Sequence, residues 1–183
     1  MKKVLVPLAN GFEDIEAVAI VDVLRRGGVE VVTASLGYDT EVLSAHGIPM
    51  RADAALADVL ENDYAAIILP GGGEGTENLR QCQPLLERLR RQKAEGGFVC
   101  AICAAPSVLA AAGVLENEHV TCYPTCVAEL GRESAGVPVV ADGLVITGQA
   151  PGSAVLFGLA LLHQLMGDIV ANRVADGMVT RLG

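Results

Sequence analysis

Aromatic side chains and histidine are scarce in this chain of 183 residues. There is no tryptophan, Phe, Trp and Tyr together make up 3% of the sequence, and histidine occurs three times. A platform that stacks bases or sugar rings on aromatic side chains is therefore not expected. Positive charge is also short, because 13 Lys and Arg stand against 22 Asp and Glu and give a net charge of −9. An acidic chain is repelled by phosphate backbones and anionic lipids, so we expect no nucleic-acid and no membrane partner.

Long apolar runs are missing as well. A bilayer-spanning helix needs about 18 apolar residues, and the longest candidate, Ala154 to Leu162, is too short. The start, Met1-Lys2-Lys3, leads into a short apolar stretch that lacks the long core and the cleavage site of a signal peptide. The five cysteines are an odd number, which suits free thiols in a reducing compartment. We expect a cytoplasmic protein.

Apolar residues make up 51% of the chain, enough for one domain with a full core over residues 1–183. Short apolar runs alternate with stretches of helical spacing. The expected strands are Lys3–Leu8, Val29–Ala34, Ala65–Leu69, Phe98–Ile102, His119–Cys122, Val137–Ala141 and Leu144–Thr147. The expected helices are Phe12–Arg26, a stripe from Leu79 to Leu89 restarted at Pro84, Ala104–Ala112, Gly152–Met166 and Asp168–Thr180, with a hairpin or edge excursion over Gly37–Pro49.

Apolar strands separated by helices predict an α/β fold, in which helices cover both faces of a mostly parallel sheet. In open sheets of this kind, ligands bind at the carboxyl ends of the strands. The segments expected to meet at that edge are Asn10–Glu16, Pro70–Gly75 and Ile102–Pro106. Reactive side chains are therefore expected in these segments.

The strongest signal is Cys103, at an abrupt junction between a strand and a helix. Small residues, Ala101 and Ala105, stand two positions to either side, as a nucleophile elbow requires for steric reasons. Pro106 suits the first turn of the helix. A thiol at a helix N-terminus is favoured as the thiolate, so we expect ionisation near neutral pH. The alternative is a buried structural cysteine, which is what most free cysteines are.

Glu16 and a glycine run supply the second signal. Glu16 lies one turn before Ile20, at the edge of an apolar stripe, whereas Glu13 and Asp14 are free to face solvent. Burial would raise the pKa of Glu16 and let it act as an acid or base; an ordinary charged helix start is the alternative. The run Pro70–Gly73 would let N–H groups approach a substrate oxygen, or would simply be a turn.

A metal site is not expected. Cys100 and Cys103 form a C-x-x-C, but Cys122 and Cys126 are separated by three residues and do not supply the second pair of a zinc site. A cysteine protease would pair its thiol with a histidine. His119 and His163 fall in a strand and a helix, and only His46 lies where it could reach the crevice.

Six blocks of sequence carry a resemblance that runs in order along nearly the whole chain. They are GFEDIEAV (11–18), DVLRRGG (22–28), ILPGGGEGTENL (68–79), AICAAPSVLA (101–110), VTCYP (120–124) and TGQAPGSA (147–154). The chain thereby resembles the ThiJ/PfpI superfamily, the family of the parkinsonism-associated protein deglycase, with the bacterial YajL branch nearest. The resemblance implies a flavodoxin-like three-layer sandwich, similar to class I glutamine amidotransferases, as one ThiJ/PfpI domain that forms a homodimer.

The resemblance also implies roles for individual residues. Cys103 matches the family's reactive, oxidation-sensitive cysteine, and Glu16 matches the buried glutamate that hydrogen-bonds it. The backbone donors around the thiol correspond to Gly71, Gly72 and Ala104. Residues of the site mouth correspond to Tyr123, Arg26 and His46, with Arg26 also near the dimer interface.

The implied function is a stress response to 2-oxoaldehydes such as methylglyoxal. The substrate would be the free aldehyde, as for a glutathione-independent glyoxalase, or an early glycation adduct on protein, as for a deglycase. Cys103 would form a hemithioacetal and Glu16 would shuttle the proton, with no cofactor. The alternative is an oxidative-stress sensor or redox-regulated chaperone that works through oxidation of Cys103. Tyr123 stands where many relatives have a histidine, which argues against a protease, and His46 replaces an arginine found in some relatives.

Overall fold

A seven-stranded sheet forms the centre of the computed structural model, which describes residues 1–180. The spatial order is β5-β2-β1-β6-β7-β9-β8. Every neighbouring pair is parallel except β8 and β9, which are antiparallel. The strands are β1 (Lys3–Leu8), β2 (Glu30–Ser35), β5 (Ala54–Ala55), β6 (Ala66–Leu69), β7 (Phe98–Ile102), β8 (Val139–Asp142) and β9 (Val145–Gly148). The prediction of a mostly parallel sheet is confirmed.

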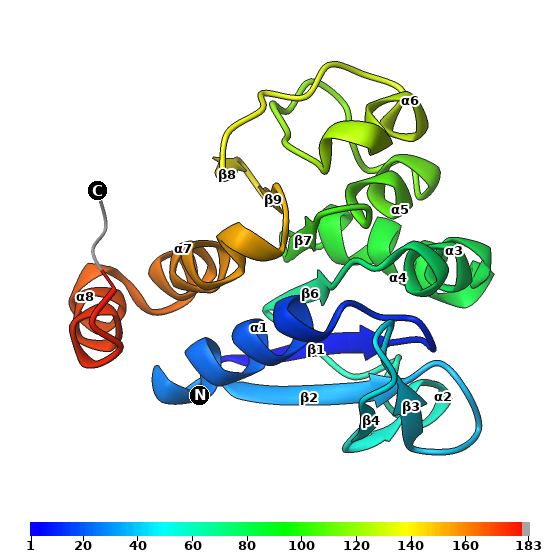
Figure 1. Ribbon diagram of the computed structural model, residues 1–183, viewed down its shortest axis with the longest axis horizontal. Coiled ribbons are helices and arrows are strands. Elements are labelled where there is room, and N and C mark those ends of the chain that lie inside the picture. The colour runs from blue at the N-terminus through cyan, green and yellow to red at the C-terminus, as the bar shows by residue number, and fades with distance from the viewer. Residues whose placement is uncertain (181–183) are drawn as a thin grey trace.

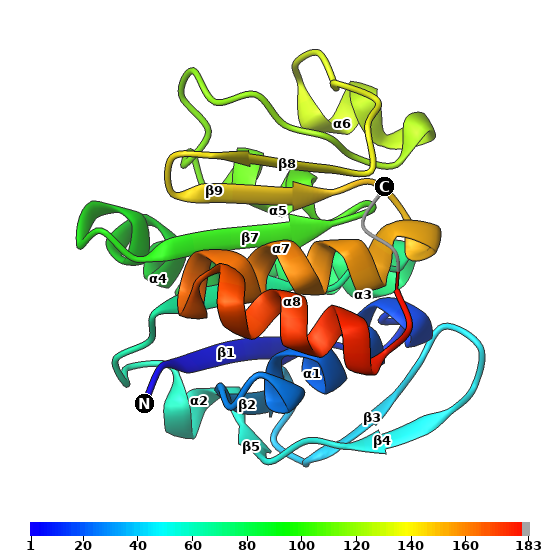
Figure 2. The ribbon, with the colours of Figure 1, turned by 90° about the vertical axis from the view of Figure 1, so that its left-hand side faces the viewer.

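Helices cover both faces of this sheet, as Figures 1 and 2 show. One face carries α1 (Asp14–Arg26), α7 (Ala154–Met166) and α8 (Asp168–Gly177), and the other carries α2 (Leu56–Val59), α3 (Gly73–Gln81), α4 (Gln83–Ala94) and α5 (Pro106–Ala111). Side chains of a strand point alternately to the two faces. In β1, Val4 and Val6 join the core under α1 and α7, while Leu5 joins the core under α4 and α5. The flavodoxin-like sandwich is thus built from two apolar cores.

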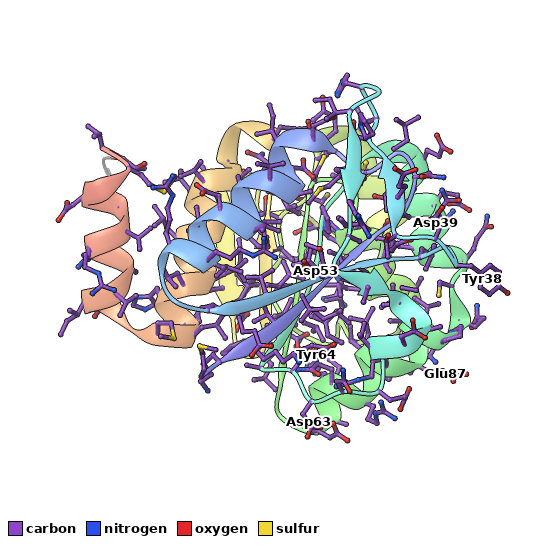
Figure 3. The ribbon with its side chains drawn as sticks, turned by 90° about the horizontal axis from the view of Figure 1, so that it is seen from below. Tyr38, Asp39, Asp53, Asp63, Tyr64 and Glu87 are labelled. Carbon is purple, nitrogen blue, oxygen red and sulfur yellow. The ribbon has the colours of Figure 1, made fainter. Side chains whose placement is uncertain are left out.

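The turn-rich stretch after β2 forms the expected hairpin. Its strands, β3 (Glu41–Leu43) and β4 (Pro49–Arg51), pair with each other and lie apart from the main sheet. Asp53, labelled in Figure 3, ties the return of this hairpin to β2, because its carboxylate accepts from the Thr33 N–H at 2.9 Å and from Arg25 at 3.0 Å. These bonds fix the base of the hairpin, whose tip reaches the N-terminal end of α1 through Ser44 and His46.

Some expected elements differ from the structure. The segment His119–Cys122 is not a strand, because side chains rather than a neighbouring strand bond its backbone: Thr121 N–H donates to Thr147 Oγ1 at 2.9 Å and Cys122 N–H donates to Ser134 Oγ at 3.1 Å. The stripe from Leu79 to Leu89 spans two helices that meet at Cys82. Short elements that sequence reasoning missed are β5, α2, α6 (Val127–Leu130) and the 3₁₀ turns at Pro124–Cys126 and Pro151–Ser153.

Among the helices of residues 1–180, none combines the length and the apolar composition needed to cross a bilayer.

Candidate active site

The carboxyl ends of β1, β6 and β7 lie side by side, because β6 pairs in parallel with both of the others. The segment after β1 carries Glu13 and Glu16, the segment after β6 carries Gly71 and Gly72, and Cys103 follows β7 directly. The expected convergence of three segments at one edge of the sheet is therefore confirmed.

Cys103 sits in a strained turn between β7 and α5. Its φ is 65°, and within residues 1–180 only one other non-glycine residue, Val179, has a positive φ. An L-residue in this region costs about 1–2 kcal/mol. Main-chain bonds on both sides hold the turn: Cys103 N–H donates to Gly148 O at 3.0 Å, and Tyr123 N–H donates to Cys103 O at 2.8 Å. The residue is 9% exposed, so its thiol is restricted but not sealed from solvent.

Glu16 is fully buried in the first turn of α1. Its Oε2 accepts from the Gly71 N–H at 2.7 Å, while Oε1 has no hydrogen-bond partner among residues 1–180. Burial raises the pKa of Glu16 to about 7, against the lowering effect of hydrogen bonds with Cys103 and Gly71. A carboxyl of this kind is half protonated near neutrality and has one oxygen still to be paired.

The glycines leave space for this contact between acid and thiol. A Cβ added at Gly71 would lie 2.7 Å from Glu16 Oε2 and 2.8 Å from Cys103 Cβ, so Gly71 stands between the two side chains. Gly72 has a φ of 97°, and a Cβ there would lie 2.2 Å from Gly11 O. Any side chain at these two positions would displace the site.

The main-chain groups expected around the thiol act on different side chains. The Gly71 N–H donates to Glu16 Oε2 at 2.7 Å. The N–H groups of Ala104 and Gly72 act on Cys103, where they lower the pKa of the thiol against the effect of burial. Gly71 therefore bonds the acid, and we expect Gly72 and Ala104 to be the donors at the sulfur.

The ionisation of Cys103 depends on burial and on the charge of Glu16. Burial and the negative charge of Glu16 raise the pKa of the thiol well above its usual range, and the Ala104 and Gly72 N–H groups offset only part of that rise. The expectation of a thiol ionised near neutrality applies to an uncharged Glu16 and stays a prediction, because the negative charge of Glu16 is among the causes that raise the pKa of the thiol here. Two anions in one buried site repel each other, so the pair favours sharing one proton.

Glu13 was expected to face solvent and is instead 8% exposed. It is the N-cap of α1: its Oε2 accepts from the Glu16 N–H at 2.7 Å, and its own N–H donates to Gly71 O at 3.0 Å. A carboxylate accepts well from the free N–H groups of a first helical turn. The acidic residue three positions before Glu16 was the signal that could have identified this cap.

The remaining candidate residues lie at different distances from the thiol. Tyr123 contributes its backbone to the elbow, and its side chain is 40% exposed. His46 lies in the hairpin between β3 and β4, and its Nδ1 is 2.6 Å from Oδ2 of Asp14 at the start of α1. Arg26 lies ten residues after Glu16 on α1, about 15 Å along the helix axis, and bonds Asp22 at 2.7 Å. Within one chain, Arg26 therefore does not join the site.

All five cysteines are free. Cys100 is fully buried in β7, which raises the pKa of its thiol beyond any working pH. A cation could be held only where donors gather, and within residues 1–180 one such group is found: Glu13, Asp14 and His46 have donor atoms within 4.8 Å of one another. The carboxylate of Asp14 is already engaged by Ser44 and His46.

Comparison with known proteins identifies the family of the chain. The profile of the DJ-1/PfpI family matches residues 2–164. A protein of Arabidopsis thaliana named DJ-1 homolog B is 39% identical over 183 residues, which cover 98% of this chain and 42% of that protein. The chain thus spans less than half the length of this relative.

Two further relatives match over most of their own length. A Caenorhabditis elegans protein named glutathione-independent glyoxalase DJR-1.2 is 40% identical over 164 residues, covering 87% of this chain and 86% of that protein. The structure described as Toxoplasma gondii DJ-1, oxidized, is 35% identical and superposes with a TM-score of 0.95 over 98% of this chain and 99% of that one.

Proposed function

The chain belongs to the DJ-1/PfpI family, and from that premise we propose that it is a Cys103-dependent enzyme that acts on 2-oxoaldehydes such as methylglyoxal. The substrate is the free aldehyde, as for a glutathione-independent glyoxalase, or an early glycation adduct on protein, as for a deglycase. The observation that carries the proposal is the buried acid beside the elbow thiol, with an oxygen of Glu16 left unpaired. The worm relative named as a glyoxalase supports the same reaction.

The reactive state holds one proton between Glu16 and Cys103. With that proton on Glu16, the charge that opposes ionisation of the thiol is gone, and the N–H groups of Gly72 and Ala104 favour the thiolate. At low pH both groups are protonated and no nucleophile forms. At high pH both are anionic and no acid remains, so the activity should have a bell-shaped dependence on pH.

The reaction begins when the Cys103 thiolate attacks the aldehyde carbon and forms a C–S bond. The aldehyde oxygen takes up the proton and gives a hemithioacetal. Glu16 then removes the hydrogen of this carbon as a proton while the neighbouring ketone oxygen takes up a proton, which gives an enediol. Glu16 returns its proton to the former ketone carbon, and the hydroxyl on the first carbon gives up its proton as the carbonyl forms. The first carbon is oxidised to a thioester and the second is reduced to an alcohol. Water hydrolyses the thioester, which releases a 2-hydroxy acid and restores the thiol.

Charge on the substrate oxygen is stabilised by main-chain donors in this scheme. Gly72 and Ala104 supply N–H groups on the side of the sulfur, and a donor of this type contributes about 3 kcal/mol in well-studied hydrolases. We do not propose a protease, because the ionisable side chain that acts on the thiol is Glu16 and not a histidine. No cofactor enters any step.

The test is lactate formation from methylglyoxal without glutathione. We expect turnover by the wild type, none by Cys103→Ala, and a loss of about 100-fold or more in Glu16→Gln, because general acid–base groups contribute about 10²–10⁴-fold. Release of N-acetylarginine from its methylglyoxal adduct, measured in parallel, separates the free aldehyde from the adduct as substrate. Equal rates for wild type and Cys103→Ala would reject the proposal.

A second candidate is an oxidative-stress sensor or redox-regulated chaperone. The donors around Cys103 that would hold a substrate oxyanion would equally hold the oxygens of a sulfinate, and one structural relative is described as oxidized. Peroxide would convert the thiolate to sulfinate with two molecules of peroxide reduced to water. A gain of two oxygen atoms confined to Cys103 in the intact mass, together with no turnover of methylglyoxal, would favour this candidate.

The proposed assembly is a homodimer in the cytoplasm, with no nucleic-acid or membrane partner. Ile15 and Val18 are more than half exposed on α1, and helical spacing puts Arg26 on the same face. A second copy packed there would cover these apolar side chains and bring Arg26 to an interface.

A further inference from the structure

Glu13 connects three parts of the site. Its Oε2 accepts from the Glu16 N–H at 2.7 Å, and its N–H donates to Gly71 O at 3.0 Å. Gly71 in turn donates to Glu16 Oε2 at 2.7 Å. Glu13, Glu16 and Gly71 therefore form a closed set of hydrogen bonds, which fixes where the Glu16 carboxyl stands relative to Cys103.

The charge of Glu13 is nearly buried and lacks a strong counterion. The residue is 8% exposed, and no Lys or Arg forms an ion pair with it within residues 1–180. The hairpin contributes one titratable neighbour, the exposed His46, which bonds Asp14 rather than Glu13. On its own helix the charged neighbours are Asp14 and Glu16. The negative charge of Glu13 therefore acts on the Glu16 carboxyl and raises the pKa of Glu16.

A negative charge beside a titrating pair increases the affinity of that pair for protons. The charge of Glu13 therefore opposes the loss of the second proton from the pair, which is the step that leaves Glu16 and Cys103 both anionic. The singly protonated state then extends to higher pH than it would beside a neutral residue.

We propose that Glu13 is a positioning residue for the reaction of Cys103: its carboxylate anchors the first turn of α1 against Gly71 and keeps one proton on the Glu16–Cys103 pair at neutral pH. This inference rests on the proposed function. Glu13 touches neither the sulfur nor the substrate in this scheme, and it acts only through Glu16.

The test separates charge from helix capping. Glu13→Gln keeps an oxygen that accepts from the Glu16 N–H but removes the charge, whereas Glu13→Asp keeps the charge and remains a good N-cap. Glu30→Gln is the matched control, because it makes the same chemical change at the start of β2, and the site lies at the other ends of the strands. The readout is the rate of Cys103 alkylation by iodoacetamide as a function of pH, with the thermal midpoint of unfolding measured for each variant.

We expect Glu13→Gln to move the pH profile of alkylation toward lower pH by about one unit, as removal of a nearby charge at reduced dielectric implies. Glu13→Asp and Glu30→Gln should keep the wild-type profile. The pH profile of lactate formation should shift by the same amount. On the alkaline side, the rate of lactate formation at a given pH should therefore fall by about tenfold. If Glu13→Gln lowers the unfolding temperature but leaves both profiles unmoved, Glu13 is a helix cap only and the inference is wrong.

Alkylation needs no turnover, so the two proposals fail separately. Absence of lactate from the wild type would reject the proposed function, while a shifted alkylation profile in Glu13→Gln would still support the control of the pair by Glu13.

Discussion

Gly71 lies between an acid and a thiol: its N–H donates to Glu16 Oε2 at 2.7 Å, and the position of a Cβ on it would be 2.8 Å from Cys103 Cβ. The distance between the two reactive groups is therefore set by a residue with no side chain. This arrangement leads to the first prediction.

Gly71→Ala should reduce both Cys103 alkylation and methylglyoxal turnover, because the added methyl group pushes Glu16 and Cys103 apart. Displacement of about 1 Å costs up to about 100-fold in rate, so we expect a loss of at least about tenfold. Gly73→Ala is the matched control, since a Cβ at Gly73 meets nothing within 4 Å. Wild-type rates in both variants would show that Gly71 does not set this spacing.

The raised pKa of Glu16 predicts a pH-dependent stability. A carboxyl whose pKa is about 7 in the folded state and 4.5 in the unfolded state holds its proton more tightly when folded. Its favourable contribution is complete below about pH 4.5 and is lost as the pH rises through about 7. The loss at high pH is on the order of 3 kcal/mol.

Urea unfolding at pH 5 and at pH 8 checks this prediction. Relative to Glu16→Gln, which carries no charge at either pH, the wild type should lose stability between the two values. A constant difference between wild type and variant would mean that Glu16 does not titrate in this range.

Thr147 should be needed to hold the segment that supports the elbow. Its Oγ1 accepts from the Thr121 N–H at 2.9 Å, and both residues are fully buried. Thr147→Val leaves that N–H unpaired, at a cost of about 1–3 kcal/mol, and loosens the chain two residues before Tyr123. We expect lower stability in chemical denaturation and slower Cys103 alkylation, with Thr147→Ser restoring both. Failure of the serine variant to restore them would assign the effect to packing.

The exposed face of α1 should mediate dimerisation. Val18 is 55% exposed, and Val18→Asp places a charge at the centre of the proposed interface. We expect this variant to sediment as a monomer at concentrations where the wild type is a dimer. Ile169→Asp is the control, because it adds the same charge at an apolar side chain that is 86% exposed on another helix, α8. A Val18→Asp dimer as tight as the wild-type one would exclude this face.

Local sequence signals predicted the sheet well. The apolar runs Lys3–Leu8 and Phe98–Ile102 match β1 and β7 residue for residue, because continuous apolar strands are typical of a sheet covered on both faces. His119–Cys122 was also expected to be a strand, but its backbone bonds the side chains of Thr147 and Ser134. A local sequence pattern cannot identify hydrogen-bond partners that lie 12 or more residues away along the chain.

The location of the site and the raised pKa of Glu16 were predictable, but the contacts around the two groups were not. The elbow at Cys103 and the acid at Glu16 follow from spacing and from the resemblance, and their roles stay predictions. The burial of Glu13 and the engagement of the Gly71 N–H depend on how α1 docks on the end of β6, which is a tertiary property. The rise in the pKa of Cys103 has the same origin, since it comes from burial and from Glu16.

The elbow is held mainly by peptide groups: Gly148 O and Tyr123 N–H fix its backbone, and Gly72 and Ala104 N–H groups act on its thiol. Peptide groups are common to all residues and survive most substitutions. A change of side chain at Tyr123 consequently leaves the main-chain bond from its N–H to Cys103 O in place, so the region around the elbow can be altered while the reactive centre keeps its shape.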